Sequence, residues 1–240
     1  MASLILLRHG QSEWNLQNRF TGWVDVELSE NGIKEAQKSG ELIKALNINL
    51  DFYFTSYLKR AIKTLEITLN ILKKSDSKII KAWELNERHY GSLTGLNKDE
   101  MKKKLGDKQI KIFRRSWNTP PPPMKESDKN NPKNDLRYSK IPSEKIPLTE
   151  SLKDTYGRVI PYFEKEVEEL IKNNKNILIS AHGNSLRAIC KKLLKISDKK
   201  ISELEIPTGN PLIINLDKNL KVIDFKYLDK ERKVDIIFNK

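Results

Sequence analysis

The histidines are the residues of this sequence whose setting most clearly indicates chemistry. The chain has three, and two of them, His9 and His182, each follow an apolar run and precede a glycine. Each run predicts a buried strand, and in α/β sheets ligands bind beyond the carboxyl ends of the strands. Glu87 follows a third strand candidate at 79–85. We therefore expect these three side chains to meet at one edge of a sheet.

Imidazole, a carboxylate and several arginines together suit phosphoryl transfer through a phosphohistidine. A neutral imidazole nitrogen can attack phosphorus when its second nitrogen is held by a hydrogen bond. Glu87 is the carboxylate best placed to exchange a proton with the substrate oxygen. The transferring group spreads negative charge over three oxygens and needs donors around it. The candidate donors are Arg8, Asn15, Arg60, Asn184 and a protonated His182.

Each of these assignments has a structural alternative. Glu87 could instead be a buried ion-pair partner of Arg88 or Arg60. For His89 a structural role and a functional role are equally well supported by the sequence. The pair at 114–115 could simply end a basic helix, because lysine and arginine often occupy the last turn.

The periodicity predicts an α/β protein with a mainly parallel central sheet and helices on both faces. Helices are expected at about 29–46, from Ser56 to 72, at 97 onward, at 110–117, at 151–173 with a kink at Pro161, and after His182. Strands are expected at 52–55, 79–85, 212–216 and 222–228 besides the two histidine runs. We expect a single domain over 1–240, with a helical and proline-rich insertion at about 97–147.

Composition excludes several other classes of protein. The formal charge of +13 comes mostly from lysines on helix faces and in loops, so no nucleic-acid partner is expected. No apolar run could span a membrane, and the N-terminus has no basic flank before its strand, so a cytoplasmic protein without a membrane partner is expected. Cys190 is the only cysteine and reads as a core side chain. Three histidines without clustered carboxylates predict no metal site.

Several stretches resemble one known family. The pairs Arg8-His9-Gly10 and His182-Gly183 are similar to the histidine phosphatase superfamily. The longer stretches resemble its 2,3-bisphosphoglycerate-dependent phosphoglycerate mutases, from about Leu4 to Leu228. These stretches are 8–15, 18–23, 55–61, 85–91, 95–98, 114–116, 150–154, 181–187 and 206–209.

The resemblance implies a phosphoglycerate mutase-like three-layer fold and a metal-independent isomerase of glycolysis and gluconeogenesis. It would interconvert 3-phosphoglycerate and 2-phosphoglycerate, primed by 2,3-bisphosphoglycerate, as a homodimer or homotetramer. A phosphatase acting on phosphomonoesters is the alternative within the superfamily. His9 would carry the phosphoryl group, Glu87 would exchange the proton, and His182 would stabilise the transition state. The implied substrate-binding residues are Arg8, Ser12, Asn15, Thr21, Gly22, Arg60, Arg88, His89, Tyr90, Lys98, Arg114, Arg115, Gly183 and Asn184.

Three positions depart from the family pattern. Gln11 stands where glutamate is usual, and Asn210 stands where an apolar residue is usual. The tail at 229–240 is short and lacks the family's usual small-residue and lysine ending, which predicts a leakier enzyme with more phosphatase side activity. A ratio of hydrolysis to mutase activity no higher than in long-tailed relatives would contradict this expectation.

Overall fold

The computed structural model describes residues 1–232 and 234, so most of the tail at 229–240 lies outside the described residues. The strands are β1 (Ala2–Arg8), β2 (Phe52–Thr55), β3 (Ile79–Lys81), β4 (Ile177–Ala181), β5 (Leu212–Leu216) and β6 (Val222–Tyr227). The helices are α1 (Glu13–Leu16), α2 (Glu30–Lys44), α3 (Lys59–Ile71), α4 (Lys98–Leu105), α5 (Asp107–Arg115), α6 (Leu152–Phe163), α7 (Glu169–Lys172) and α8 (Gly183–Leu193). No helix in these residues is long and apolar enough to cross a membrane.

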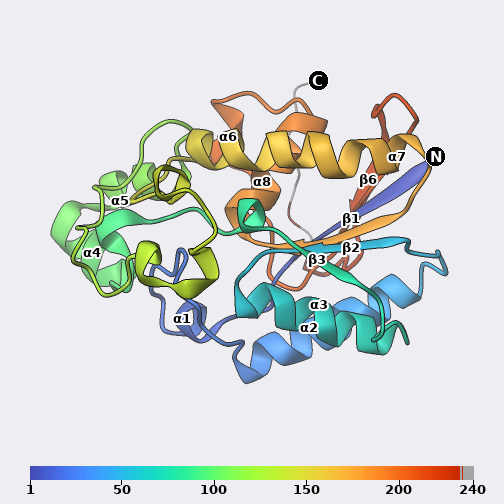
Figure 1. Cartoon of the computed structure of the whole chain (residues 1–240), viewed down its shortest axis with the longest axis horizontal. Helices are drawn as coiled ribbons and strands as arrows, with labels where there is room; N and C mark the ends of the chain where they lie inside the picture. Colours follow the sequence, from blue (N-terminus) through green and yellow to red (C-terminus); the bar gives the residue numbers. More distant parts are fainter. Residues whose placement is uncertain (233, 235–240) are drawn as a thin grey trace.

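Strand β1 is buried on both of its faces and organises the layers. Leu4 and Leu6 pack in the core cluster that includes α6 and α8, whereas Ile5 and Leu7 pack in the cluster that includes α2 and α3. Because successive side chains of a strand point to opposite faces, an uninterrupted apolar run requires cover on both sides. Helices α6, α7 and α8 lie on one side of the sheet, and α2 and α3 lie on the other (Figure 1).

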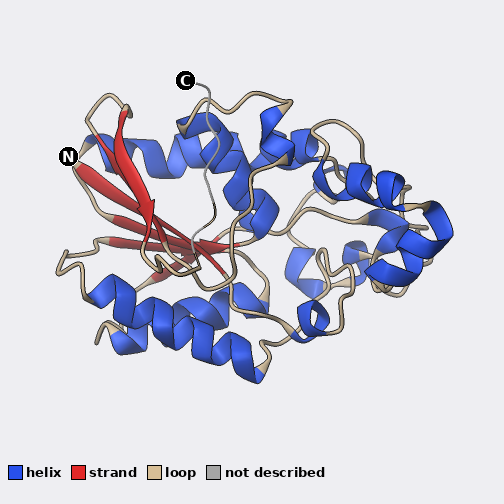
Figure 2. Cartoon of the chain, turned by 180° about the vertical axis from the view of Figure 1, so that it is seen from behind, coloured by secondary structure: helices blue, strands red, loops and turns tan. Residues whose placement is uncertain are grey.

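The sheet has the strand order β3-β2-β4-β1-β5-β6. The first four strands run parallel, and β5 and β6 are antiparallel to their neighbours, which confirms the predicted mainly parallel sheet. β1 and β4 are paired in register up to Arg8 and Ala181. The reverse view shows the sheet between its two helical layers, with the helical insertion at one end (Figure 2).

Two predicted boundaries were wrong. The strand expected at 79–85 ends at Lys81, because β2, its partner among the described strands, ends at Thr55; a 3₁₀ turn at Trp83–Leu85 follows. Glu87 therefore follows this turn and does not follow a strand directly. Ser56 does not cap α3, whose N-cap is Leu58. The Ser56 hydroxyl turns instead toward the second histidine.

The helix expected at 151–173 begins as predicted but is not continuous. Ser151 caps α6 through a reciprocal pair of hydrogen bonds with Asp154. Pro161 lies inside α6, and a π-helical turn, Glu164–Glu168, separates α6 from α7. Proline cannot donate a backbone hydrogen bond, so irregularity near it is expected.

The insertion at 97–147 lies at the opposite end of the sheet from the N-terminus (Figure 1). Asn97 caps α4 as predicted, by accepting hydrogen bonds from the N–H groups of residues 99 and 100. The proline-rich stretch after α5 has only three short 3₁₀ turns. It is anchored, because Tyr138 is buried and its ring lies 4.9 Å from that of Trp23. The loop therefore helps to form a small hydrophobic cluster that is separate from the core around the sheet.

Candidate active site

The register of β1 with β4 brings the two strand-end histidines together. Both follow directly after the last paired residues, Arg8 and Ala181, and the His9 N–H continues the ladder by donating to the Ala181 carbonyl at 3.0 Å. Neighbouring strands lie about 4.8 Å apart, and the ring centroids of His9 and His182 are 4.9 Å apart. The structure thus confirms that the two histidines meet, and the reason is strand pairing.

Hydrogen bonds assign the tautomer of His9. Its Nδ1 lies 2.7 Å from the Gly10 carbonyl oxygen, which can only accept, so Nδ1 carries the proton. The Arg60 Nε–H donates to His9 Nε2 at 3.3 Å. Burial, followed by the charges of Arg60 and Arg8, lowers the pKa of His9 well below its usual value. His9 is therefore a neutral imidazole, and Nε2 is its unprotonated, nucleophilic nitrogen.

His182 is also fully buried. Its Nε2 lies 2.8 Å from the Ser56 hydroxyl oxygen, and its Nδ1 has no hydrogen-bond partner among the described residues. Burial, followed by the charges of Arg60, His9 and Arg8, lowers the pKa of His182 well below its usual value. Without an anion in the site His182 is neutral, so the protonated form expected from the sequence requires the added negative charge of a phosphoryl group.

Arg60 and Arg8 place positive charge beside the two histidines. Arg60 is buried and donates to the carbonyls of Val24 and Gly22 at 2.9 and 2.8 Å. Burial lowers its pKa to about 10, so the guanidinium stays charged at neutral pH. Arg8 donates from Nη1 to the Ile206 carbonyl at 2.7 Å. Position 60 lies in the first turn of α3, as predicted, where the N-terminal amides add to the positive potential.

Some guanidinium nitrogens here are buried without a hydrogen-bond partner among the described residues. They are Nε of Arg8, Nε and Nη1 of Arg88, and Nε of Arg187. An unpaired buried donor costs about 1–3 kcal/mol. A fold that retains this cost at several adjacent donors is organised to receive acceptors, and the acceptor that suits guanidinium groups is an anionic oxygen.

Glu87 is held from three directions. Its Oε1 accepts the Arg88 N–H at 2.7 Å, the Asn184 N–H at 3.1 Å and the Asn184 side-chain amide at 2.8 Å. Its carbonyl accepts from Trp23 Nε1 at 2.6 Å and from Arg158 at 2.9 Å. Glu87 forms no ion pair with Arg88 or Arg60 among the described contacts. The ordered carboxylate beside the histidines fits the predicted proton-exchange role.

Two small cavities lie side by side at this point and share the walls Arg8, Glu87, Tyr90 and Arg114. The first, of about 80 Å³, contains His9 and is also lined by Asn15, Arg19, Phe20, Thr21, Gly22, Arg60 and Lys98. The second, of about 110 Å³, is also lined by Arg115, Gly183, Asn184, Arg187, Glu205 and Ile206. Cationic residues far outnumber the carboxylates, so the pair of cavities suits a small polyanion.

The insertion supplies part of these walls. Lys98 begins α4, and Arg114 and Arg115 end α5. Because Arg114 and Arg115 also line the cavities, this arginine pair lies at the site and is not just a basic helix end. Arg115 forms an ion pair with Glu205, and Arg88 donates to the Arg114 carbonyl. The insertion is thereby fastened to the rim of the cavity.

The structure places some predicted site residues outside the cavities. Ser12 caps α1 by accepting the Asn15 N–H at 3.2 Å. His89 is buried, and its Nδ1 accepts the Gly91 N–H at 3.0 Å. Arg88 and His182 lie behind the lining residues, with Arg88 5.0 Å from the centre of the Tyr90 ring. Direct substrate contacts by Ser12, Arg88 and His89 stay predictions.

Arg187 and Arg158 are functional candidates that the sequence patterns did not indicate. Arg187 donates to Asn184 Oδ1 at 2.9 Å and to the Ile201 carbonyl. Because residues three apart share a helix face, the spacing from Asn184 is a signal that would have found it. Arg158 forms a buried ion pair with Glu150 at 2.7 Å and donates to three carbonyls of the Glu87 segment. No local pattern marks Arg158.

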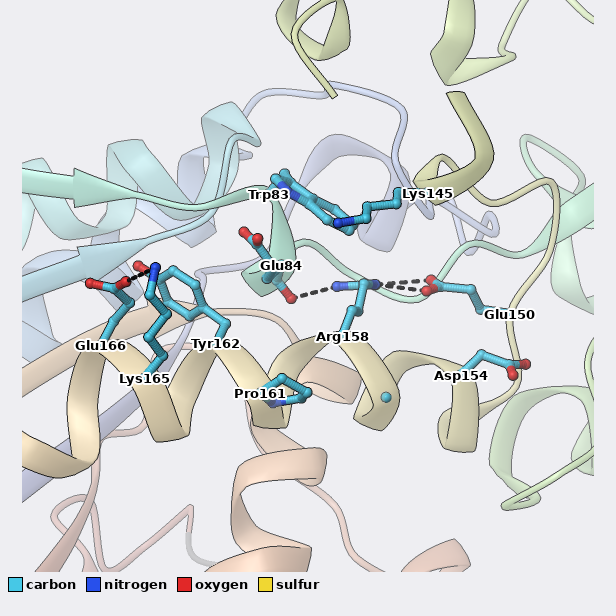
Figure 3. A pocket seen from close by; sticks show the side chains of 11 residues that line it. Trp83, Glu84, Lys145, Glu150, Asp154, Arg158, Pro161, Tyr162, Lys165 and Glu166 are labelled. Atoms are coloured by element: carbon cyan, nitrogen blue, oxygen red, sulfur yellow. Dashed lines mark hydrogen bonds and ion pairs between the residues drawn. The ribbon is translucent and has the colours of Figure 1, made fainter. Parts of the chain in front are cut away.

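A larger hollow of about 590 Å³ lies between Trp83 and Glu84 and the helix that carries Arg158 (Figure 3). Arg158 lines it, together with Trp83, Glu84, Tyr162 and several charged residues of α6 and its continuation. Neither strand-end histidine reaches this hollow. Its mixture of carboxylates and lysines lacks the surplus of cationic side chains seen around His9, so the smaller cavities are the better candidate for anion chemistry.

Two further expectations concern metal and thiol chemistry. Among residues 1–232 and 234, no group of three or more histidine, cysteine, aspartate or glutamate side chains is arranged to hold a metal ion. Cys190 is fully buried, as predicted, and burial raises the pKa of its thiol to about 12. The thiol therefore stays protonated and belongs to the core of α8.

Arg187 offers a first prediction. Its bond to Oδ1 orients the Asn184 amide so that Nδ2 faces Glu87. Arg187→Met should allow the amide to rotate and should lower kcat about tenfold or more, the usual cost of losing a charge-assisted hydrogen bond. Steady-state kinetics and thermal unfolding measured together check this. Lys192→Met, on the same helix but paired with Glu164 and Glu168, is the control; equal losses of kcat in both variants would contradict the prediction.

Lys98 offers a second prediction. Burial lowers its pKa to about 8, so the ammonium loses its proton as pH rises through that value. The KM for an anionic substrate is therefore expected to rise above pH 8. Lys98→Arg keeps its charge over this range, and its KM should rise later. Parallel KM profiles in the two proteins would show that another group is responsible.

Comparisons with known proteins agree with this geometry. Residues 4–227 match the histidine phosphatase superfamily (branch 1). A protein of Pelagibacter ubique named 2,3-bisphosphoglycerate-dependent phosphoglycerate mutase is 54% identical over 237 residues, 99% of this chain and 99% of that protein. One of the same name from Treponema denticola is 48% identical over 236 residues, 98% of this chain and 96% of that protein.

Solved structures support the fold alone. Bacillus stearothermophilus YhfR superposes with a TM-score of 0.69 at 22% identity, covering 92% of this chain and 94% of that one. A putative alpha-ribazole-5'-P phosphatase from Escherichia coli gives a TM-score of 0.68 at 17% identity, covering 92% and 94%. The full-length matches in sequence, on a fold that joins the two histidines, show that this chain belongs to the 2,3-bisphosphoglycerate-dependent phosphoglycerate mutases of the histidine phosphatase superfamily.

Proposed function

We propose that this chain interconverts 3-phosphoglycerate and 2-phosphoglycerate through a phosphoryl group carried on His9 and supplied first by 2,3-bisphosphoglycerate. The observation that carries the proposal is the unprotonated Nε2 of His9 inside a cavity whose charged lining residues are mostly cationic. The names of relatives that are about half identical to this chain support phosphoglycerates as the substrates.

Loading of His9 is a displacement at phosphorus. The Nε2 lone pair forms the N–P bond while the bond from phosphorus to the leaving oxygen of the bisphosphate breaks. The leaving oxygen takes a proton from Glu87 and becomes the hydroxyl of a monophosphoglycerate. Arg8, Arg60 and His182 offset the charge on the equatorial oxygens. The Gly10 carbonyl holds Nδ1–H throughout and keeps the imidazole in its reactive tautomer.

Isomerisation needs the reverse step on a different hydroxyl. 3-Phosphoglycerate gives the proton of its 2-hydroxyl to Glu87 as that oxygen attacks the phosphohistidine, which regenerates free His9 and the bisphosphate. The bisphosphate then returns its 3-phosphoryl group to His9 and leaves as 2-phosphoglycerate. Phosphate groups are conserved in each cycle, provided that water does not attack the phosphorus of the phosphohistidine. Lys98 and Arg114 of the insertion close the cavity over the intermediate and supply this exclusion.

The test is a mutase assay with and without added 2,3-bisphosphoglycerate on protein first freed of bound phosphate. We expect turnover only after the primer is added, at a rate that a chelator leaves unchanged. Hydrolysis of varied monoesters at comparable rates, without dependence on the primer, would favour the alternative phosphatase and overturn the proposal.

A further inference from the structure

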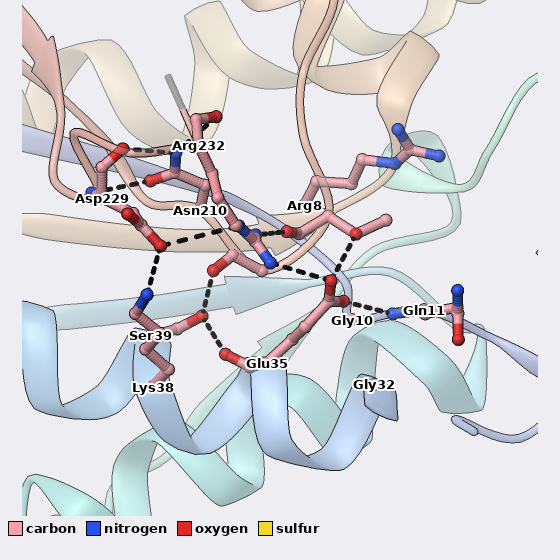
Figure 4. A network of polar contacts seen from close by, with 12 residues as sticks. Arg8, Gly10, Gln11, Gly32, Glu35, Lys38, Ser39, Asn210, Asp229 and Arg232 are labelled. Atoms are coloured by element: carbon pink, nitrogen blue, oxygen red, sulfur yellow. Dashed lines mark hydrogen bonds and ion pairs between the residues drawn. The ribbon is translucent and has the colours of Figure 1, made fainter. Parts of the chain in front are cut away.

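Glu35 of α2 lies between the Gly10–Gln11 segment, which follows His9, and Arg232 of the C-terminal part of the chain (Figure 4). Its Oε2 accepts the Gln11 N–H at 2.7 Å. Its Oε1 accepts the Thr208 hydroxyl at 3.0 Å and forms an ion pair with Arg232 at 3.0 Å. The side chain is 11% exposed. A carboxylate this enclosed acts on the groups that it contacts, because little water screens it.

The first of these contacts reaches the catalytic histidine through one peptide unit. The Gln11 N–H and the Gly10 carbonyl belong to the same planar amide, so fixing one fixes the other. That carbonyl accepts the His9 Nδ1–H at 2.7 Å. Glu35 and His9 are therefore the two ends of a hydrogen-bonded chain, in which each bond polarises the next.

The surrounding packing keeps this amide in place. A Cβ atom on Gly10 would lie 2.2 Å from the Gly32 carbonyl oxygen, and one on Gly32 would lie 2.0 Å from the Gln11 oxygen. Only glycines allow the loop and the first turn of α2 to approach so closely. The Gly10 N–H donates to the Thr64 hydroxyl at 3.0 Å. The amide thus has no freedom to turn its carbonyl away from His9 while Glu35 holds its N–H.

The second contact joins Glu35 to the C-terminal part of the chain. Arg232 pairs with Glu35 and donates to the Thr208 carbonyl. Asn210 is buried and binds the segment from Asp229 to Arg232 through three hydrogen bonds. Its side-chain amide donates to the carbonyls of Asp229 and Arg232 at 3.1 and 3.2 Å, and its side-chain oxygen accepts the Asp229 N–H at 3.0 Å. These hydrogen bonds explain the polar residue at position 210, where the family usually has an apolar one.

We propose that Glu35 is a positioning residue for His9, which holds and polarises the Gly10–Gln11 amide, and that Arg232 is the counterion that moderates its charge. The inference rests on the proposed function for its kinetic consequence. Negative charge at Glu35 strengthens the Gly10 carbonyl as an acceptor and so makes Nε2 a better nucleophile, as a carboxylate does directly in other catalytic histidines. Arg232 offsets part of that charge.

Glu35→Gln and Arg232→Gln should therefore act differently on one step, the single-turnover phosphorylation of His9 by 2,3-bisphosphoglycerate. We expect Glu35→Gln to slow it about tenfold or more while KM changes little, since a charge-assisted hydrogen bond is lost. Arg232→Gln should react at least as fast as the unaltered protein. Glu41→Gln, an exposed position of the same helix, is the matched control. Equal slowing by Glu35→Gln and Arg232→Gln would mean that Glu35 only fastens the segment, and would overturn the proposal.

A second measurement is independent of turnover. Nitrogen NMR of the His9 ring in the free protein should show protonated Nδ1 in both proteins, with ring-nitrogen shifts in Glu35→Gln displaced toward those of a less polarised imidazole, because the hydrogen bond to the Gly10 carbonyl is weaker. If the unaltered protein is not phosphorylated by 2,3-bisphosphoglycerate, the proposed function fails and the ring spectrum still tests Glu35. An unchanged ring spectrum in a folded Glu35→Gln variant would refute the positioning role by itself.

Discussion

His9→Ala is expected to lose mutase activity by about 10⁴-fold or more, the scale seen when a catalytic nucleophile is removed. The variant should also take up no acid-labile phosphate from 2,3-bisphosphoglycerate. The reason is positional: among the described residues only His9 presents to the cavity an unprotonated imidazole nitrogen with a fixed tautomer. Phosphate incorporation and steady-state turnover are the two measurements.

Substitutions of the other two histidines serve as controls for this prediction. His89→Gln should still be labelled, because His89 lies outside both cavities and its ring accepts the Gly91 N–H. His182→Gln should be labelled slowly, since His182 lies 4.9 Å from His9 and contributes donors but no attacking nitrogen. Undiminished labelling of His9→Ala would place the phosphoryl group on another residue and reject the proposed mechanism.

Glu87→Gln is expected to lower kcat by about 10² to 10⁴-fold, the usual contribution of a positioned acid or base. The three N–H groups that converge on Oε1 can all donate to the glutamine oxygen as well, so the variant should fold and bind substrate with nearly unchanged KM. The loss should appear in the transfer step itself. Rapid-quench measurement of His9 phosphorylation, with KM and thermal unfolding determined alongside, separates these effects.

A neighbouring carboxylate provides the matched control. Glu84 lies on the same segment and lines the larger hollow, which no histidine lines, and it lines neither of the two small cavities. Glu84→Gln should therefore leave kcat within about twofold, the range expected of substitutions away from special features. A KM increase without a change in kcat for Glu87→Gln would assign this carboxylate to substrate binding, and proton exchange would then need another group.

The elements were predictable to the extent that their patterns are local. The strands at 52–55 and 212–216 and the caps Ser29, Asn97 and Ser151 were predicted as observed, because strand alternation and side-chain capping depend on near neighbours. The end of β3 was missed, since it depends on where β2 stops. Ser56 resembled a cap in sequence, but its hydroxyl lies against His182.

The site was predictable where spacing along the chain is short. Arg8 and His9 at a strand end, and Gly183 and Asn184 after His182, followed from the apolar runs and from the family resemblance. The positions of Arg158 and Arg187 followed from neither. Arg158 reaches the Glu87 carbonyl from α6, 71 residues away. Such contacts depend on how helices pack across the sheet, and no periodicity in one segment records that.

The strand that ends at Arg8, directly before His9, shows which features of the site followed from the sequence and which followed from the tertiary structure. The sequence by itself determined that a histidine would end a buried strand beside anion donors, and that a second strand would end in the same way. Only the tertiary structure decided that the two strands pair in register, that the Gly10 amide holds Nδ1, and that Glu35 and Arg232 stand behind it. The reason is that these contacts join residues far apart in the sequence, and only the packed fold sets the distances between them.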